Sequence, residues 1–279
     1  MSILDEILEH KVTIELPARK KKVPLTEMRK AALTAPAPRN FAAALQKTDG
    51  RVALIAEVKR ASPSKGELVK GGFDPVVLGQ IYEANGASAI SVLTDEKYFK
   101  GALAYMSAVK NAVNIPVLRK DFIIDEYQIH EARAAGADAI LLIVAALDDA
   151  MLAEFYAIAT ALKMTALVEV HDETEVDRAL AVGAQVIGVN NRDLRNFEVN
   201  LGITARCANH LRAKQMAFWS PQNPSLSNAI TLVSESGIST PNHVARVADM
   251  GACAILVGES IIVSANLPEQ VQALSSVRL

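Results

Sequence analysis

One short pattern recurs four times along the chain and constrains its fold more than any other feature. The copies are "NGASAISVLT", "AGADAILLIV", "VGAQVIGVNN" and "MGACAILVGE", each with Gly-Ala, two further residues and a short apolar run. A helical-looking segment precedes each copy, and glycine is favoured where a helix ends in a left-handed residue. The apolar runs are typical of parallel strands buried on both faces. Each copy therefore predicts the end of a helix followed by a buried strand.

Four more apolar runs alternate with these copies: "VALIAEV", "IPVLRKDF", "TALVEV" and "AITLVSES". Eight strands that alternate with helices favour a (β/α)8 TIM barrel, an α/β fold, over an open sheet. We expect a single barrel domain over residues 1–279, with residues 1–48 forming an N-terminal helical extension. Apolar residues at helical spacing in this extension predict helices that cover one end of the barrel; they are Ile3, Leu4, Ile7 and Leu8, then Phe41 and Leu45.

The interval before the last copy of the repeat is the longest. The excess lies in "RAKQMAFWSPQNPSLSN", residues 212–228, between the sixth helix and the seventh strand. A connection from a helix to a strand lies at the amino-terminal face of such a barrel, which serves stability. We therefore expect an insertion on the face opposite the functional site.

Composition excludes several classes of function. The hydrophobic fraction is 51% and the net charge is −2, so nothing points to a nucleic-acid partner. The run Arg19-Lys20-Lys21-Lys22 has acidic residues nearby and no interleaved aromatics, which predicts a solvated helix face.

Few features point to metals, disulfides or membranes. The two cysteines, Cys207 and Cys253, have small or apolar neighbours and predict inert thiols in a reducing compartment. No pair among the five histidines has metal-ligand spacing, so no metal site is expected. The start "MSILDEILEH" lacks a basic segment, and the longest apolar run, residues 139–147, is far shorter than the ~20 residues that span a bilayer. We expect a cytoplasmic protein without a membrane partner.

Polar and charged residues gather where the predicted strands end. In this fold the functional groups stand at the carboxyl ends of the strands. Side chains alternate along a strand, so Glu57 and Lys59 share one face, as do Asn190 and Arg192. Ionisable side chains on an inner face are costly unless they are paired or functional. The residues at these ends are Glu57, Lys59, Lys120, Glu169, Asn190, Arg192, Glu235, Ser236, Gly237 and Gly258.

Two interpretations of this group are open: a ring of salt bridges that closes the barrel mouth, or a functional site. A phosphate-type turn beside it favours the site. Ser236 and Gly237 in "SESGI" follow strand seven, and Gly258 in "VGES" begins a short helix after strand eight. Backbone N–H groups at these positions form the usual phosphate site of such barrels. The carboxylate of Glu259 would repel phosphate, so only its backbone N–H can help.

Seven motifs in order resemble the indole-3-glycerol phosphate synthase family of the tryptophan pathway. They are "EVKRASPSKG", "VLTDEKYFKG", "LRKDFIID", "ALVEVH", "GVNNRDL", "SESGI" and "LVGES". The resemblance implies the ring closure, decarboxylation and dehydration of 1-(2-carboxyphenylamino)-1-deoxyribulose 5-phosphate. The products are indole-3-glycerol phosphate, carbon dioxide and water. It implies a small-molecule phosphosugar substrate and no cofactor, and we expect a monomer.

The resemblance also implies roles for the residues at the strand ends. Lys120 is similar to the general acid and Glu169 to the general base. Lys59 resembles the lysine that pairs with the anthranilate carboxylate, and which lysine acts as the acid at which step stays open. Glu57 and Asn190 resemble the polar pair that positions these groups. The remaining matches are Ser62, Arg192, Glu235 and Ser236 for substrate, Gly237, Gly258 and Glu259 for phosphate, and Leu93 and Phe99 for the aromatic ring.

The segment "RASPSKG" after Lys59 is predicted to be a mobile lid. Two other functions are compatible with the same barrel. A Schiff-base aldolase would use Lys120 as its nucleophile and needs a lowered lysine pKa; neighbouring carboxylates should instead keep Lys120 charged. A non-catalytic phosphosugar-binding barrel would need the phosphate turns but not Glu169.

Overall fold

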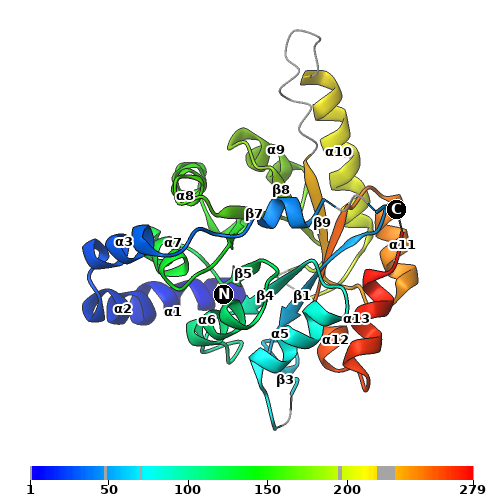
Figure 1. Cartoon of the computed structure of the whole chain (residues 1–279). Helices are drawn as coiled ribbons and strands as arrows, with labels where there is room; N and C mark the ends of the chain where they lie inside the picture. The colour runs from blue at the N-terminus through cyan, green and yellow to red at the C-terminus, as the bar shows by residue number, and fades with distance from the viewer. Residues whose placement is uncertain (1, 47–48, 70, 194–196, 219–229, 279) are drawn as a thin grey trace.

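The structure of the chain is a computed structural model that describes residues 2–46, 49–69, 71–193, 197–218 and 230–278. Within these residues, eight parallel strands close into a barrel, which confirms the predicted (β/α)8 fold (Figure 1). The strand that begins the barrel, β1, pairs with the last strand, β10, and with β4, and so closes the ring. In ring order the strands are β1 (Ala53–Val58), β10 (Ala254–Val257), β9 (Thr231–Glu235), β8 (Val186–Asn190), β7 (Thr165–Val170), β6 (Ala139–Ile143), β5 (Val117–Lys120) and β4 (Ala89–Leu93).

Helices surround the barrel and precede it. The organisation of residues 1–279 as one domain with an extension over 1–48 stays a prediction. The extension carries α1 (Ile3–His10), a π-helical turn η1 (Lys11–Glu15), α2 (Leu16–Lys22), α3 (Leu25–Thr34) and α4 (Phe41–Ala44). The other helices are α5 (Pro75–Ala84), α6 (Leu103–Ala112), α7 (Glu126–Ala134), the 3-10 turn η2 (Val144–Ala146), α8 (Asp149–Ala161), α9 (Glu173–Ala181), α10 (Gly202–Phe218), α11 (Pro241–Asp249), α12 (Glu259–Ile262) and α13 (Leu267–Ser275).

Alternation along each strand divides the core in two. In β1, Leu54 and Ala56 belong to the large apolar cluster between barrel and helices. Ala53 and Ile55 belong to the smaller cluster inside the barrel. Glu57, two residues further, is therefore on the inner face, where it is 3% exposed.

The glycines of the repeat have the conformation that their position at helix ends predicts. All four have a positive φ, from 76° at Gly183 to 112° at Gly251. A residue with a Cβ is strained in that region of φ, so glycine lets the chain leave the helix and enter the next strand.

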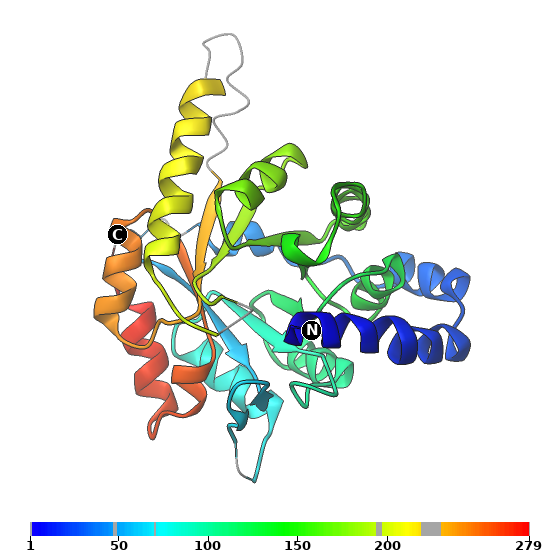
Figure 2. The ribbon, with the colours of Figure 1, turned by 180° about the vertical axis from the view of Figure 1, so that it is seen from behind.

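The extension covers both ends of the barrel, so the expectation that its helices cover one end was wrong. Phe41 and Leu45 are fully buried and pack with Ala53, the first residue of β1, inside the barrel. They close the amino-terminal end. Ile3 and Ile7 of α1 instead line the cavity at the carboxyl ends of the strands. In both ribbon views α1, α2 and α3 extend together to one side of the barrel (Figures 1 and 2).

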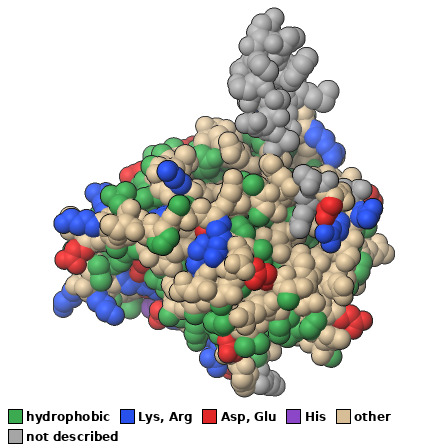
Figure 3. All heavy atoms as spheres, in the orientation of Figure 1, with side chains coloured by type: hydrophobic (Ala, Val, Ile, Leu, Met, Phe, Trp, Pro, Cys, Tyr) green, Lys and Arg blue, Asp and Glu red, His purple; other side chains and the backbone are tan. Residues whose placement is uncertain are grey.

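The basic run in α2 is only partly the solvated face that its composition predicts. Lys20, Lys21 and Lys22 are exposed. The prediction was wrong for Arg19, whose side chain is 16% exposed and lies 2.7 Å from a carboxylate oxygen of Glu131 in α7. On the face shown in Figure 3, basic side chains of the described residues are interspersed with acidic ones.

The expected insertion begins as helix. Helix α10 continues to Phe218, so residues 212–218 extend it, and the helix projects beyond the barrel in both ribbon views (Figures 1 and 2). Residues 219–229 lie outside the described residues. The segment leads into the amino-terminal end of β9, whereas the cavity lies at the carboxyl ends of the strands.

None of the described helices combines the length and the apolar character that a bilayer crossing requires. Cys207 is buried, and burial raises the pKa of its thiol to about 12, which agrees with the inert thiol that the sequence predicts there.

Candidate active site

A cavity of about 470 Å³ opens at the carboxyl ends of the barrel strands. All fourteen residues that the sequence singled out line it, although they come from seven of the strands or the loops after them. They are Glu57, Lys59, Ser62, Leu93, Phe99, Lys120, Glu169, Asn190, Arg192, Glu235, Ser236, Gly237, Gly258 and Glu259. The closure of the barrel therefore gathers residues that are distant in the sequence around a single space.

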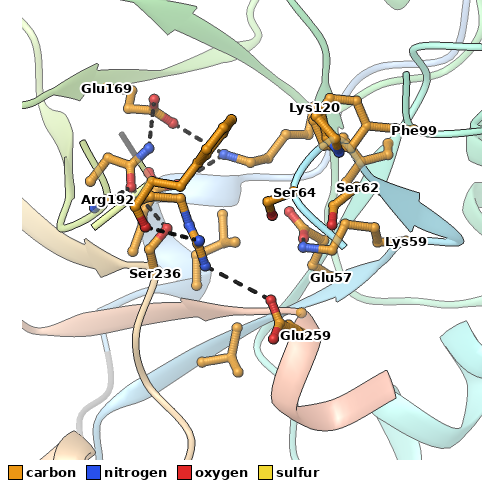
Figure 4. Close-up of a pocket in the computed structure, with 18 of the residues that line it drawn as sticks. Glu57, Lys59, Ser62, Ser64, Phe99, Lys120, Glu169, Arg192, Ser236 and Glu259 are labelled. Carbon is orange, nitrogen blue, oxygen red and sulfur yellow. Dashed lines mark hydrogen bonds and ion pairs between the residues drawn. The ribbon is translucent and has the colours of Figure 1, made fainter. Parts of the chain in front are cut away.

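Lys120, the last residue of β5, is the centre of the charged group. Its Nζ lies 3.1 Å from Oε2 of Glu169 in β7 and 2.9 Å from Oε2 of Glu235 in β9. Figure 4 shows the lysine extending its amine across the cavity toward Glu169. All three side chains point inward because each occupies an inner-face position of its strand.

The three groups shift one another's pKa values. Burial disfavours the Lys120 ammonium, but the neighbouring carboxylates, led by Glu235 and Glu169, outweigh this effect and raise its pKa. Burial, reinforced by Glu169 and opposed by Lys120, raises the pKa of Glu235 to about 7. Burial would also raise the pKa of Glu169, but Lys120 and His171 lower it by more. The site therefore holds a charged lysine, a carboxylate and a second carboxyl that gains a proton near neutral pH.

A chain of hydrogen bonds orients Glu169. The amide of Asn190 donates from Nδ2 to Oε1 of Glu169 at 3.1 Å. The amide oxygen of Asn190 accepts in turn from Ser236 Oγ at 2.8 Å and from the backbone N–H of Arg192 at 3.1 Å. Asn190 can therefore turn its donor only toward the carboxylate.

Lys59 and Glu57 form a separate pair in the cavity. Lys59 Nζ lies 2.7 Å from Glu57 Oε1, and their side chains are 14% and 4% exposed. In Figure 4 the two lie together, apart from the group around Glu169. The cavity thus holds two ammonium groups with different partners.

The loops after β9 and β10 require glycine for different reasons, space at Gly258 and backbone conformation as well as space at Gly237. A Cβ on Gly258 would lie 2.3 Å from Oε1 of Glu57, and the φ of Gly258 is −125°, so space rather than backbone conformation requires glycine there. Gly237 has a φ of 78°, and a Cβ on it would lie 2.3 Å from Cγ1 of Val199. Because β9 and β10 are neighbours in the barrel, the backbone of these two loops lies side by side in the cavity lining.

Glu259 has cationic partners beside these loops. Its Oε1 lies 2.6 Å from Lys65 Nζ, and its Oε2 lies 3.8 Å from Arg192 Nη2. Lys65 lies in a short hairpin, immediately before its second strand. The two strands, β2 (Ala61–Ser62) and β3 (Gly66–Glu67), are antiparallel, and the hairpin includes most of the segment predicted to be a lid. The lid is thus a folded hairpin tied to the start of α12, and its mobility stays a prediction.

Apolar side chains line the other wall of the cavity. The rings of Phe99 and Phe122 pack at 6.1 Å between centroids, and Leu93 stands beside them in the lining. Sequence reasoning did not single out Phe122, although it follows Lys120 by two residues and alternation could have placed it at the mouth. The lining also includes Ile3, Leu4 and Ile7 of α1. Their helical spacing predicts a helix against one end of the barrel but not that this end is the one with the cavity.

A second ionic cluster lies on the outer face of β5. Nζ of Lys11, in η1, is fully buried and lies 2.7 Å from Asp121 Oδ1 and 3.1 Å from Asp95 Oδ2. Asp121 also accepts from Arg119 at 3.1 Å and from Thr94 at 2.5 Å. The cluster anchors the N-terminal extension immediately behind Lys120.

Among the described residues, no group of three or more His, Cys, Asp or Glu has the arrangement of a metal site. A closed barrel with a cavity at its carboxyl ends, lined by paired lysines and glutamates, defines a (β/α)8-barrel enzyme with an acid–base site.

Comparison with known proteins gives the particular family. The model of the indole-3-glycerol phosphate synthase family matches residues 4–274. The chain is 50% identical to the indole-3-glycerol phosphate synthase of Roseiflexus sp. (strain RS-1) over 279 residues, which cover 98% of each protein. It is 46% identical to that of Laribacter hongkongensis (strain HLHK9) over 267 residues, 95% of each. The chain belongs to the indole-3-glycerol phosphate synthase family.

Membership confirms the resemblance stated from the seven motifs, and with it the class of enzyme, a decarboxylating carbon–carbon lyase of tryptophan synthesis. The fold is shared more widely. Thiamine phosphate pyrophosphorylase from Pyrococcus furiosus has a TM-score of 0.58 at 14% identity, over 81% of this chain and 95% of that one. At that identity the likeness concerns the fold alone.

Proposed function

We propose that the cavity at the barrel mouth converts 1-(2-carboxyphenylamino)-1-deoxyribulose 5-phosphate to indole-3-glycerol phosphate, with Lys120 as general acid and Glu169 as general base. The observation that carries this assignment is the contact of the buried Lys120 ammonium with Glu169 and Glu235 on the inner face of the mouth. The family gives the reaction, and the contacts among these three side chains support the roles proposed for Lys120 and Glu169.

Ring closure requires a proton donor. When an aromatic carbon attacks the substrate carbonyl, negative charge develops on its oxygen, and a cationic acid both stabilises that charge and supplies the proton. The raised pKa of Lys120 keeps it protonated before the reaction. Loss of the proton to substrate leaves a neutral amine between two carboxyl groups, and Glu235, whose pKa is about 7, can hold a proton nearby.

Dehydration requires a base as well as an acid. The pKa of Glu169 is lowered by Lys120 and His171 against the effect of burial, so this carboxyl is ionised and can accept a proton. Asn190 holds one oxygen of the carboxylate at 3.1 Å. That bond fixes the direction in which the free lone pairs point, which favours proton transfer from a substrate carbon.

Lys59 binds the carboxylate of the substrate's aromatic ring in this assignment. Glu57, 2.7 Å from its Nζ, holds the ammonium in the cavity, and the phenyl rings of Phe99 and Phe122 offer the ring an apolar wall. Release of carbon dioxide then removes the charge that Lys59 compensates, and Lys59 is left as a second acid.

The phosphate is assigned to the backbone of Gly237, Gly258 and Glu259, with Ser236 and Arg192 beside it. Support comes from the absence of side chains on the two glycines and from the cations Lys65 and Arg192 that Glu259 draws to this side. Gly258→Ala adds a Cβ beside Glu57 without a charge and should bind inorganic phosphate weakly, whereas Gly258→Asp should abolish binding, both measured by calorimetry. Unchanged binding in a folded Gly258→Asp protein would remove the phosphate from these loops.

The Schiff-base alternative requires a neutral lysine. The pKa of Lys120 is shifted the opposite way, which speaks against nucleophilic attack by its amine. A non-catalytic binding barrel makes no use of a buried lysine with two carboxylates, a pairing that is costly to maintain.

The assignment is tested with the fluorescence of the indole product. The wild type should turn over the carboxyphenylamino-ribulose phosphate, and Glu169→Gln should lose about 10²–10⁴-fold in kcat while substrate still binds. Glu173→Gln, on the outer helix α9, is the matched control and should retain its rate. A Glu169→Gln protein with half the wild-type kcat would remove the base from this residue.

A phosphosugar substrate fits the family, whereas a monomeric state and a cytoplasmic location are predictions from the sequence. Sedimentation equilibrium would test the first, and fractionation of the source cells the second.

A further inference from the structure

His171 stands directly behind Glu169 and is not part of the cavity lining. It follows Glu169 by two residues, just after the end of β7, so its side chain leaves the chain on the same side. Its Nε2 lies 3.5 Å from Oε1 of Glu169. That nitrogen is buried and makes no hydrogen bond within the described part of the chain.

The other side of the ring is held by Glu175. Oε2 of Glu175 accepts from the backbone N–H of His171 at 2.7 Å and lies 3.0 Å from its Nδ1. Glu175 is itself placed in the first turn of α9, where its backbone N–H donates to Asp172 Oδ1 at 2.9 Å. The imidazole is therefore fixed in position by the start of the helix that follows β7.

The two carboxylates determine which protons the ring carries. A carboxylate at Nδ1 only accepts, so Nδ1 bears a hydrogen. A neutral ring would then turn the lone pair of Nε2 toward the Glu169 carboxylate, whereas the imidazolium turns an N–H toward it. The charged form is favoured by Glu175, Glu169 and the more distant Glu235, and these groups raise the pKa of His171 although burial lowers it.

We propose that His171, clamped by Glu175, is a positioning residue that acts through Glu169, keeping this carboxylate ionised and correctly oriented while it serves as the base. The inference rests on the proposed role of Glu169. Glu169 then has a cation at each of its two oxygens. Lys120 lies at Oε2 and is proposed to react with substrate, whereas His171 lies at Oε1, outside the cavity lining, and does not react.

The first experiment is the pH dependence of kcat/KM between pH 5 and 9. Without the imidazolium, Glu169 should take up a proton at higher pH, so the acidic limb in His171→Asn should move up by about one pH unit. Above pH 8, where Glu169 is ionised in both proteins, the difference in kcat/KM should be smallest, and what remains of it measures the loss of orientation. Glu175→Gln should shift the limb in the same direction by less, because the ring remains but loses one of its carboxylates.

The matched control is His210→Asn. His210 also pairs with a carboxylate, Asp177, at 2.8 Å, but it lies on α10 outside the site. Its profile should superimpose on that of the wild type. A His171→Asn profile that also superimposes would overturn the proposal.

A second measurement does not depend on the folding of a histidine variant. The titration of His171 is followed by NMR in the wild type and in Glu169→Gln. If the two groups are coupled, loss of the Glu169 charge must lower the titration midpoint of His171. The shift should match the one that the His171 charge causes in the pKa of Glu169, because the coupling free energy is reciprocal. An unchanged midpoint would overturn the proposal, whereas an active Glu169→Gln enzyme would instead overturn the role of Glu169, so the two failures are distinguishable.

Discussion

The two faces of β5 both carry buried charge, but the charge is arranged differently. On the outer face, Lys11 and Arg119 contact Asp121, and further carboxylates lie within reach. On the inner face, Lys120 lies between Glu169 and Glu235. Successive residues of one short strand thus point into a closed cluster on one side and into an open cavity on the other.

The difference lies in the cations that contact one carboxylate. Asp121 contacts both Lys11 and Arg119, whereas Glu235 shares Lys120 with Glu169. Burial alone would raise the pKa of Asp121, but Lys11 and Arg119 hold it well below its usual range. On the inner face burial and like charge raise the pKa of Glu235 to about 7. A buried carboxylate held by two cations, as Asp121 is, stays ionised and fixes structure. A buried carboxyl that shares one cation with a second carboxylate, as Glu235 does, keeps a proton available near neutral pH.

Removal of the inner cation should have the largest effect on function. In Lys120→Met we expect kcat to fall about 10²–10⁴-fold while substrate still binds, because a general acid acts mainly in the transition state. Steady-state kinetics with the fluorescent product would measure this. Lys214→Met, which removes a partly exposed partner of Asp177, is the control. A Lys120→Met enzyme with half the wild-type kcat would contradict the role.

Removal of the outer cation should instead cost stability. Lys11→Met removes the cation that contacts Asp95 and one of the two cations that contact Asp121, and breaking such a buried pair costs about 3–5 kcal/mol in the free energy of unfolding. Urea denaturation would measure the loss. Lys20→Met removes a more exposed pair with Asp125 and should cost less than about 1 kcal/mol. If kcat of the folded Lys11→Met protein fell as far as that of Lys120→Met, the outer cluster would serve catalysis and not only stability.

The raised pKa of Glu235 predicts a pH dependence of stability. Because the pKa of Glu235 is about 7 in the folded protein and its ordinary value is 4.5, the native state binds a proton that the unfolded chain has released. This contribution is fully present below about pH 4.5 and is lost as the pH rises through about 7. Between pH 5 and pH 8 the wild type should therefore lose more unfolding free energy than Glu235→Gln, by at most about 3 kcal/mol.

Urea denaturation at pH 5 and pH 8 would measure this difference. Glu169 does not contribute to this difference, because its lowered pKa means that the carboxyl titrates at more acidic pH. Equal losses of unfolding free energy in the two proteins would mean that Glu235 is ionised throughout this pH range, as Asp121 is on the outer face.

The smallest effect is expected far from both clusters. Replacement of residues 219–228 by a short Gly-Ser link should leave kcat/KM within a few fold, because the segment connects α10 to the amino-terminal end of β9. The deletion begins after Phe218, so the contacts of α10 through Lys214 and Arg212 are kept. Near-complete loss of activity in a folded deletion protein would show that the segment reaches the site.

The inner cluster could largely be predicted from the sequence and the outer cluster could not. Inward positions follow from alternation within a strand, so Glu57, Lys120 and Glu169 could be placed at one mouth once the barrel was recognised. The same rule would have found Phe122 and His171, two residues beyond Lys120 and Glu169. The outer cluster depends on Lys11, which lies in the extension and carries no local signal of burial.

The sequence by itself determined the barrel, the faces of its strands and the family, because repeat spacing, side-chain alternation and short motifs are local properties of the chain. The tertiary structure decided which charges meet. The sequence predicts a solvated Arg19 and gives no sign that Lys11 is buried, but closure of the barrel and docking of the extension bring both onto carboxylates of distant elements. It also decided the state of Glu235, because a pKa depends on burial and on every charge nearby, and those neighbours are set only when the ring of strands closes.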